Sequence, residues 1–217
     1  VTLYLDDIEE NVTVSGRAYY SRDSVKPTGT VKLNTSSRIA FLNGYADGTF
    51  RPEANMTRAE AVVMLYRLSD VENVSNTGDI FIDVPYNMWC AGEINAFANA
   101  GIIDVTSYFH PNQYITRAEF VEMLYRLMGS PSYSRGTLRF SDVTGATNED
   151  AIYYAVSRGW VNGYADGTFR PFSYIARSEV AALMTRLLNR TSGGSGVSYK
   201  DVPYTYWAYR YIQLASS

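Results

Sequence analysis

The sequence GYADGTFRP at residues 44–52 decides the architecture of this chain, because it recurs without change at residues 163–171. A shorter, altered copy lies about halfway between the two and ends in YFHP at residues 108–111. Recurrence of one segment at a regular interval indicates a chain built from copies of a single structural unit.

Two further blocks recur in step with this loop, with a period of about 59 residues. One follows each loop and has the form Thr-Arg-Ala-Glu, with small changes, at residues 57–60, 116–119 and 176–179. The other has an aromatic residue followed by x-Asp-Val, at residues 81–84, 140–143 and 199–202.

The repeat region does not start and finish at the boundaries of whole repeats. It begins with the back half of a repeat at residues 37–70 and finishes with a front half at 197–217. Full repeats lie between them, at about 79–128 and 138–190. A half-repeat cannot bury its apolar face alone, so we expect the two halves to complete one lobe of a three-lobed ring.

Each repeat predicts two helices joined by a loop, so the expected fold class is mainly α. The back helix of the first copy is expected at residues 57–68, where apolar residues recur at helical spacing. The front helices are expected to begin at Trp89 and Trp207, after an Asp-Val-Pro sequence suited to the start of a helix. We expect residues 199–217 to pack against the helix at 57–68, and the buried surface to come from Trp207, Tyr211, Ile212 and Leu214.

Residues 1–36 do not follow the repeat. Residues 1–5 and 12–14 have the apolar, β-branched pattern of short strands. Residues 21–36 are rich in Ser, Thr, Gly and Pro, as in a linker. We therefore interpret residues 1–36 as an extension, such as the tail of an upstream domain, and 37–217 as the repeat domain.

Composition argues against several kinds of function. The net charge is -3, so there is no basic surplus for nucleic-acid binding, and no apolar run reaches the ~18–20 residues of a membrane span. Cys90 and His110 are single copies of their residue types, which excludes an internal disulfide and cysteine-cluster or multi-histidine zinc sites. We expect neither metal nor cofactor, and interpret His110 as a surface histidine.

The repeated Thr-Arg-Ala-Glu block has a structural interpretation at two of its positions. Thr57 with Glu60, and Thr116 with Glu119, have the spacing of a capping box, in which each member satisfies an amide of the other. The third copy has Ala176 at the cap position, so only the Glu179 half of the box is expected there.

The arginine of this block needs a different explanation. Arg58, Arg117 and Arg177 fall at the first helical position, where the helix dipole disfavours a cation. Free amides at a helix N-terminus together with a guanidinium group suit an anionic ligand. The alternative is an arginine that is packed or ion-paired within the protein.

The glycine-rich loop predicts tight turns. Asn43-Gly44, Asn162-Gly163 and Asp47-Gly48 are pairs that favour turns with positive φ, and glycine also lets a ligand approach the backbone. One carboxylate per loop is too few for a calcium site.

Four aromatic residues near these loops have two interpretations each. Tyr45 and Tyr164 either stack on a sugar or pack within the protein, and Trp89 and Trp207 are either core residues or platforms at the edge of a groove.

Taken in this order and period, the blocks resemble the S-layer homology (SLH) domain family over residues 37–217. The resemblance implies a pseudo-threefold arrangement of helix-loop-helix repeats around a central helix bundle. It also implies grooves between lobes that bind secondary cell-wall polymers, commonly glycans carrying ketal-pyruvate on N-acetylmannosamine. Such binding tethers secreted proteins noncovalently to the bacterial cell wall or S-layer.

By position, the resemblance assigns ligand binding to three kinds of residue: the arginines Arg58, Arg117 and Arg177, the glycines Gly44 and Gly163, and the aspartates Asp47 and Asp166. The middle loop departs from the pattern, because residues 104–107 read DVTS and the loop is two residues shorter. Assigning each loop to the arginine of its own repeat, we expect Arg58 and Arg177 to dominate binding and Arg117 to matter little.

The leading hypothesis is a noncatalytic module that anchors an exported protein to the cell wall by binding a wall polysaccharide. Two alternatives stay open at this point. One is an enzyme acting on wall glycans, with carboxylates facing each other across a groove. The other is a structural protein that assembles with itself or with other surface-layer subunits.

Overall fold

A computed structural model describes residues 33–34, 39–72, 79–132, 139–145, 148–194 and 196–217. The described residues form isolated β-bridges but no sheet, so the expected mainly α fold class is confirmed. The strands expected at residues 1–5 and 12–14 lie outside the described part of the chain. The helices are α1 (Arg58–Arg67), α2 (Ala91–Asn99), α3 (Arg117–Leu127), α4 (Glu149–Ser157), α5 (Arg177–Leu187) and α6 (Tyr209–Ala215).

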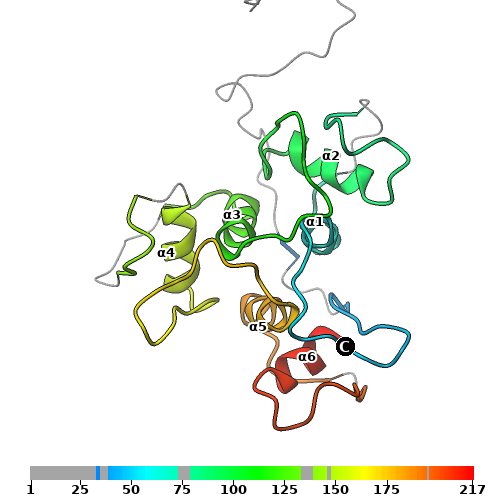
Figure 1. Cartoon of the computed structure of the whole chain (residues 1–217), viewed down its shortest axis with the longest axis vertical. Helices are drawn as coiled ribbons and strands as arrows, with labels where there is room; N and C mark the ends of the chain where they lie inside the picture. The colour runs from blue at the N-terminus through cyan, green and yellow to red at the C-terminus, as the bar shows by residue number, and fades with distance from the viewer. Residues whose placement is uncertain (1–32, 35–38, 73–78, 133–138, 146–147, 195) are drawn as a thin grey trace, which may run out of the picture.

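The helices form three lobes around a common centre (Figure 1). Helices α1, α3 and α5 lie at the centre and are seen end-on, whereas α2, α4 and α6 lie outside them. Each outer helix packs against the central helix that precedes it in the chain. Among the described helices, none is long and apolar enough to cross a membrane.

A closed ring of backbone hydrogen bonds joins the three repeats at the centre. The amide of Met56 donates to the carbonyl of Ile175 (3.1 Å), and the amide of Ile175 donates to the carbonyl of Ile115 (3.1 Å). The amide of Ile115 completes the ring by donating to Met56 (2.9 Å). All three side chains are buried, so each repeat depends on both others for its backbone partners at this point.

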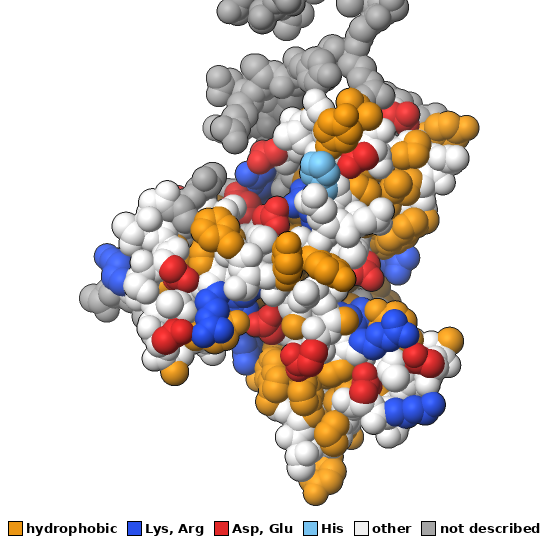
Figure 2. Space-filling model, in the orientation of Figure 1, with side chains coloured by type: hydrophobic (Ala, Val, Ile, Leu, Met, Phe, Trp, Pro, Cys, Tyr) orange, Lys and Arg blue, Asp and Glu red, His pale blue; other side chains and the backbone are white. Residues whose placement is uncertain are grey.

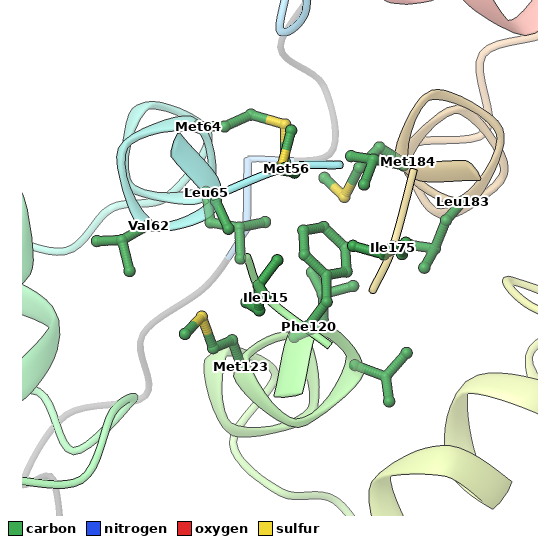
Figure 3. Close-up of a cluster of buried hydrophobic side chains, with 14 of the residues drawn as sticks. Met56, Val62, Met64, Leu65, Ile115, Phe120, Met123, Ile175, Leu183 and Met184 are labelled. Atoms are coloured by element: carbon green, nitrogen blue, oxygen red, sulfur yellow. The ribbon is translucent and has the colours of Figure 1, made fainter. Parts of the chain in front are cut away.

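Side chains of the three central helices fill the space between them (Figure 3). One helical position holds Ala61 in α1, Phe120 in α3 and Val180 in α5, and all three are fully buried. The ring of Phe120 projects toward the centre, between the other two helices. Three residues as large as phenylalanine would overpack this space, which explains why Phe120 is opposed by two smaller residues.

The first amides of each central helix donate hydrogen bonds to carbonyls at the end of the loop in the next repeat. The first two amides of α1 donate to Gln113 and Pro111, at 2.8 and 3.0 Å. Equivalent bonds run from α3 to the carbonyls of Ser173 and Pro171, and from α5 to those of Ala54 and Pro52. Donors that a helix leaves unpaired at its N-terminus are therefore satisfied by a neighbouring repeat.

An aspartate from each aromatic-x-Asp-Val block clamps the end of a loop. Asp201 accepts hydrogen bonds from the amides of Phe50 (2.8 Å) and Arg51 (2.7 Å). Arg51 has a φ of 57°, a left-handed conformation that costs free energy for a residue other than glycine. Asp83 and Asp142 clamp the other two loops in the same way, onto Phe109 with His110 and onto Phe169 with Arg170.

The clamp at Asp201 brings the first and last half-repeats together. The ring of Tyr199 packs on Phe50 with centroids 5.3 Å apart, and the amide of Phe41 donates to Ala215 at 2.9 Å. Residue 34, assigned above to the extension, also contacts the repeat domain, since its amide donates to the carbonyl of Leu68 at 2.7 Å.

Three details of the expected closure are wrong. Helix α6 packs against α5 rather than against α1, because an outer helix pairs with the central helix that precedes it. Ile212 and Leu214 are buried as expected, but Trp207 is exposed and Tyr211 only half-buried. Helices α2 and α6 begin at Ala91 and Tyr209, two residues later than expected.

Replacing Asp201 by alanine tests the closure. The variant leaves two loop amides without their carboxylate partner, so we expect a loss of about 3 kcal/mol in the free energy of unfolding. For a domain of this size the melting temperature should fall by roughly 6–12 °C. Asp83→Ala, which opens an internal clamp, should cost a similar amount.

Tyr204→Ser, an exposed change in the same segment, serves as the control for Asp201→Ala. Deleting residues 199–217 removes the clamp and α6 together and should abolish the cooperative unfolding transition. An unchanged melting temperature for Asp201→Ala or for the deletion would contradict closure of the ring by the two half-repeats.

Candidate functional site

Each of the three arginines reaches from its own helix to the loop of the next repeat. The Nε atoms of Arg58, Arg117 and Arg177 donate to the carbonyl oxygens of Phe109, Phe169 and Phe50, at 2.9, 3.0 and 3.0 Å. Each guanidinium group also lies 4.8 Å from the ring centroid of that same phenylalanine. The arginines are thereby held at the contact between two lobes, which we call a seam and name after its arginine.

This geometry corrects the assignment of loops to arginines. The Arg58 seam contains the altered middle loop, whereas the two identical loops lie in the Arg117 and Arg177 seams. The expectation that Arg117 matters little rested on pairing each arginine with the loop of its own repeat. The arginine that faces the altered loop is Arg58.

Two of the arginines form an ion pair with the glutamate of the next repeat. Arg58 donates to Glu119 and Arg117 donates to Glu179, each at 2.5 Å. Within the described residues, Arg177 has no carboxylate at ion-pair distance, although it is only 6% exposed. Its additional hydrogen bond is to the carbonyl of Asn43, at 2.8 Å.

Most of the helix amides that the sequence suggested for an anion are already occupied. The first two amides of each central helix donate to carbonyls of the next repeat. The third amide of α1 donates to the hydroxyl of Thr57. The third amide of α3 donates to Thr116 in the same way, whereas that of α5 has no such partner because Ala176 lacks a hydroxyl. In the Arg58 and Arg117 seams, any anion-binding capacity therefore comes from the arginine side chains rather than from free amides of a helix N-terminus.

The predicted capping boxes are present. The carboxylate of Glu60 accepts from the amide of Thr57 at 2.8 Å, and the hydroxyl of Thr57 accepts from the amide of Glu60 at 3.2 Å. Thr116 and Glu119 make the same pair of bonds. At α5 the glutamate half alone remains, with Glu179 accepting from the amide of Ala176 at 2.9 Å.

A tyrosine from each intact loop covers the neighbouring arginine, and we call it the tyrosine lid. The ring of Tyr164 lies 5.1 Å from the guanidinium of Arg117, and its hydroxyl donates to Glu179 at 3.1 Å. Burial raises the pKa of the Tyr164 hydroxyl. The ring of Tyr45 lies 5.0 Å from the guanidinium of Arg177.

The loop aspartates brace their own loops. Asp166 accepts from the amide and hydroxyl of Thr168 and pairs with Arg170, and these bonds, the threonine hydroxyl foremost, lower its pKa to about 2. In the first loop, the hydroxyl of Thr49 is the main cause that holds the pKa of Asp47 well below its usual range. A ligand role for these two aspartates stays a prediction.

Gly44 and Gly163 are required by packing rather than by a turn. Neither has the positive φ expected from the Asn-Gly pairs, which occurs instead at Gly48 and Gly167, with φ of 82° and 79°. A Cβ atom on Gly163 would lie 2.1 Å from Cε1 of Phe140 and 2.8 Å from a backbone oxygen. Gly44 meets Tyr199 in the same way, so these two glycines let the clamp block pack against the loop.

Trp89 and Trp207 are exposed residues in the turns before α2 and α6, which contradicts their interpretation as core. Trp207 lies beside Tyr206 and Tyr211, with ring centroids 5.9 and 6.4 Å apart. Figure 2 shows that apolar side chains reach the surface near the centre of the viewed face and over the α6 lobe. A platform role for either tryptophan stays a prediction.

The Arg58 seam contains an open groove with a volume of about 460 Å³. It is lined by Arg58, Glu119, Gln113 and residues 106–110 of the altered loop. Tyr108 and His110 in this loop stack with their ring centroids 5.8 Å apart and their planes 17° apart. Sequence reasoning placed neither residue in the site and interpreted His110 as a surface histidine; the signal that points to them is the shortening of the loop.

The missing half of the third capping box gives a stability test. Ala176 has nearly the same backbone conformation as Thr57 and Thr116, so Ala176→Thr should add the absent hydrogen bond. We expect a gain of about 1 kcal/mol in the free energy of unfolding, and a loss of about 1 kcal/mol for Thr57→Ala. Denaturant unfolding of both variants measures this, and opposite signs from those stated would refute the capping assignment.

The described residues thus form a module of three helical repeats with an arginine at each seam. Residues 40–62, 83–121 and 139–181 match the family model described as the S-layer homology domain, and these segments belong to that family. Among the described residues, no group of three or more His, Cys, Asp or Glu side chains is placed to hold a metal ion.

Curated proteins with similar sequences include two from Acetivibrio thermocellus. The chain is 35% identical to "Cell surface glycoprotein 1" over 185 residues, and this alignment covers 78% of this chain and 8% of that protein. It is 35% identical over 190 residues to a "Cellulosome-anchoring protein", covering 82% of this chain and 42% of that protein. A third, the "Amylopullulanase" of Thermoanaerobacterium thermosulfurigenes, is 30% identical over 158 residues, or 70% of this chain and 8% of that protein. The chain therefore spans less than half the length of each.

Proposed function

We propose that the repeat domain is a noncatalytic module that anchors a protein to the bacterial cell wall. It binds an anionic wall polysaccharide in the seams between its lobes and acts outside the cell, at the wall or S-layer surface. The observation that carries this proposal is the placement of one arginine in each of three equivalent seams. The family, and the anchoring and cell-surface names of two similar proteins, support it.

The seams combine the groups that a charged sugar needs. The Nε hydrogen bond fixes each guanidinium, which orients its remaining N–H donors for a carboxylate. Aromatic rings beside each arginine offer an apolar surface to the face of a sugar. A ketal-pyruvate presents both a carboxylate and an apolar methyl group, so a pyruvylated glycan is the polysaccharide that we propose.

The charge of the chain favours local recognition over general attraction. The net charge is -3, so an anionic polymer gains nothing from the long-range field of the protein. Binding must then come from local contacts with the arginines at the seams.

The glutamates of two seams argue against the enzyme alternative. In Glu119 and Glu179, one carboxylate oxygen holds the capping box and the other pairs with an arginine. A glycosidase needs a carboxylic acid that can donate a proton to the leaving group. Carboxylates fixed by two sets of donors are poorly suited to that step.

Binding to purified wall sacculi tests this function. The wild-type protein should bind sacculi, lose binding once the secondary polymer is removed, and release no reducing ends. The variant Arg58→Gln/Arg117→Gln/Arg177→Gln should bind at least 100-fold more weakly, because each arginine supplies charge-assisted hydrogen bonds. Arg67→Gln changes an exposed arginine in the last turn of α1, away from the seams, and serves as the control.

The alternatives predict other results in the same experiment. Release of reducing ends would indicate an enzyme, and association of the protein with itself but not with sacculi would indicate a structural protein. A melting curve for each variant separates loss of binding from loss of fold.

A further inference from the structure

We infer that the three seams are unequal and that the Arg58 seam receives the sugar, with Tyr108 and His110 as the platform beneath it. This inference rests on the proposed function and names which arginine, and which additional residues, carry it out. The sequence predicted that the grooves with intact glycine loops bind the ligand, whereas here the seam with the altered loop binds it.

The first observation is the lack of a tyrosine lid. The altered loop is two residues shorter and has DVTS at the place of the Gly-Tyr-Ala-Asp-Gly turn. As a result, the side chain of Arg58 is 19% exposed and that of Glu119 40%, whereas the values for Arg117 and Glu179 are 7% and 26%. The ion pair of the Arg58 seam is the more accessible of the two.

The second observation concerns the Nη2 atom of each arginine. In the intact seams this atom donates to a loop carbonyl, from Arg117 to Asn162 at 3.4 Å and from Arg177 to Asn43 at 2.8 Å. In the Arg58 seam, Nη2 makes no hydrogen bond to any described residue. Shortening of the loop therefore leaves Arg58 with donors that a ligand carboxylate can use.

The third observation is the groove itself. Its volume of about 460 Å³ lies within the roughly 300–1,000 Å³ usual for small-ligand sites. Thr106, Ser107 and Gln113 line it together with the arginine. These hydroxyl and amide groups suit the hydroxyls of a sugar.

The platform is fixed before any ligand arrives. His110 has a left-handed φ of 60° and its amide donates to the Asp83 clamp at 2.8 Å. The hydroxyl of Thr106 donates to the carbonyl of Tyr108 at 2.7 Å. The stacked pair is thus held by the loop backbone, so ligand binding costs little conformational entropy.

The ion pair between Arg58 and Glu119 limits how much of the affinity for the sugar the arginine can supply. Because Glu119 already pairs with Nη1, a ligand carboxylate binds chiefly at Nη2 of Arg58. The aromatic platform then has to supply much of the remaining affinity. A sugar with one carboxylate next to a flat apolar face, at a chain end or within a polymer, fits both requirements.

Calorimetry with a methyl glycoside of N-acetylmannosamine that carries a ketal-pyruvate tests the inference, with the unpyruvylated glycoside as the ligand control. We expect one site per chain. Arg58→Gln and Tyr108→Ala should each weaken binding about tenfold or more, while Tyr108→Trp retains a platform and most of the affinity. The matched changes Arg117→Gln and Tyr164→Ala probe the neighbouring seam, and each should weaken binding less than its counterpart Arg58→Gln or Tyr108→Ala.

The same five variants are compared in binding to wall sacculi, so the inference is tested even if this glycoside is not the natural sugar. Three equal sites, or losses confined to Arg117→Gln and Tyr164→Ala, would overturn the inference and leave the proposed function intact. A wild-type protein that binds neither glycoside nor sacculi would overturn the proposed function itself. Because Tyr108 is half-exposed, its replacement should leave the melting temperature unchanged.

Discussion

The ring of hydrogen bonds that joins Met56, Ile115 and Ile175 is the constraint on which the rest of the structure depends. Each of these residues donates to one neighbouring repeat and accepts from the other. No repeat can satisfy its own backbone at the centre, so the three lobes are parts of one cooperative unit. This differs from a linear solenoid, where a repeat contacts only its neighbours and can be added or lost at an end.

The same arrangement determines how a binding seam is assembled. The ring and the bonds to the first helical amides place the start of each central helix on the loop of the next repeat. An arginine therefore meets a loop about 50 residues later in the chain, or, for Arg177, one that lies far earlier in the sequence. A sequence change in one repeat alters the environment of the arginine that belongs to its neighbour.

The sequence predicted what depends on a single repeat. The period, the mainly α class and the capping pairs Thr57–Glu60 and Thr116–Glu119 follow from local patterns, because propensity and capping act over a few residues. The partner of α6 and the loop facing each arginine were predicted wrongly, since both depend on contacts between repeats. A repeating pattern leaves the choice of neighbour ambiguous.

The roles of some single residues were predicted wrongly for a similar reason. Gly163 has the look of a turn residue, but its lack of a side chain serves the packing of Phe140. Trp207 has the apolar size of a core residue yet lies at the surface. In both cases the deciding contact, or its absence, involves the packing of separate segments and leaves no trace in the local sequence.

The meeting of the two half-repeats has a consequence for chain connectivity. The amides of Phe41 and Leu42 both donate to the carbonyl of Ala215, so the first and last parts of the repeat domain lie side by side. Nothing in the threefold geometry requires the polypeptide to be interrupted at this lobe rather than at another. A circularly permuted chain, joined between residues 217 and 39 and opened between residues 72 and 79, should therefore form the same ring.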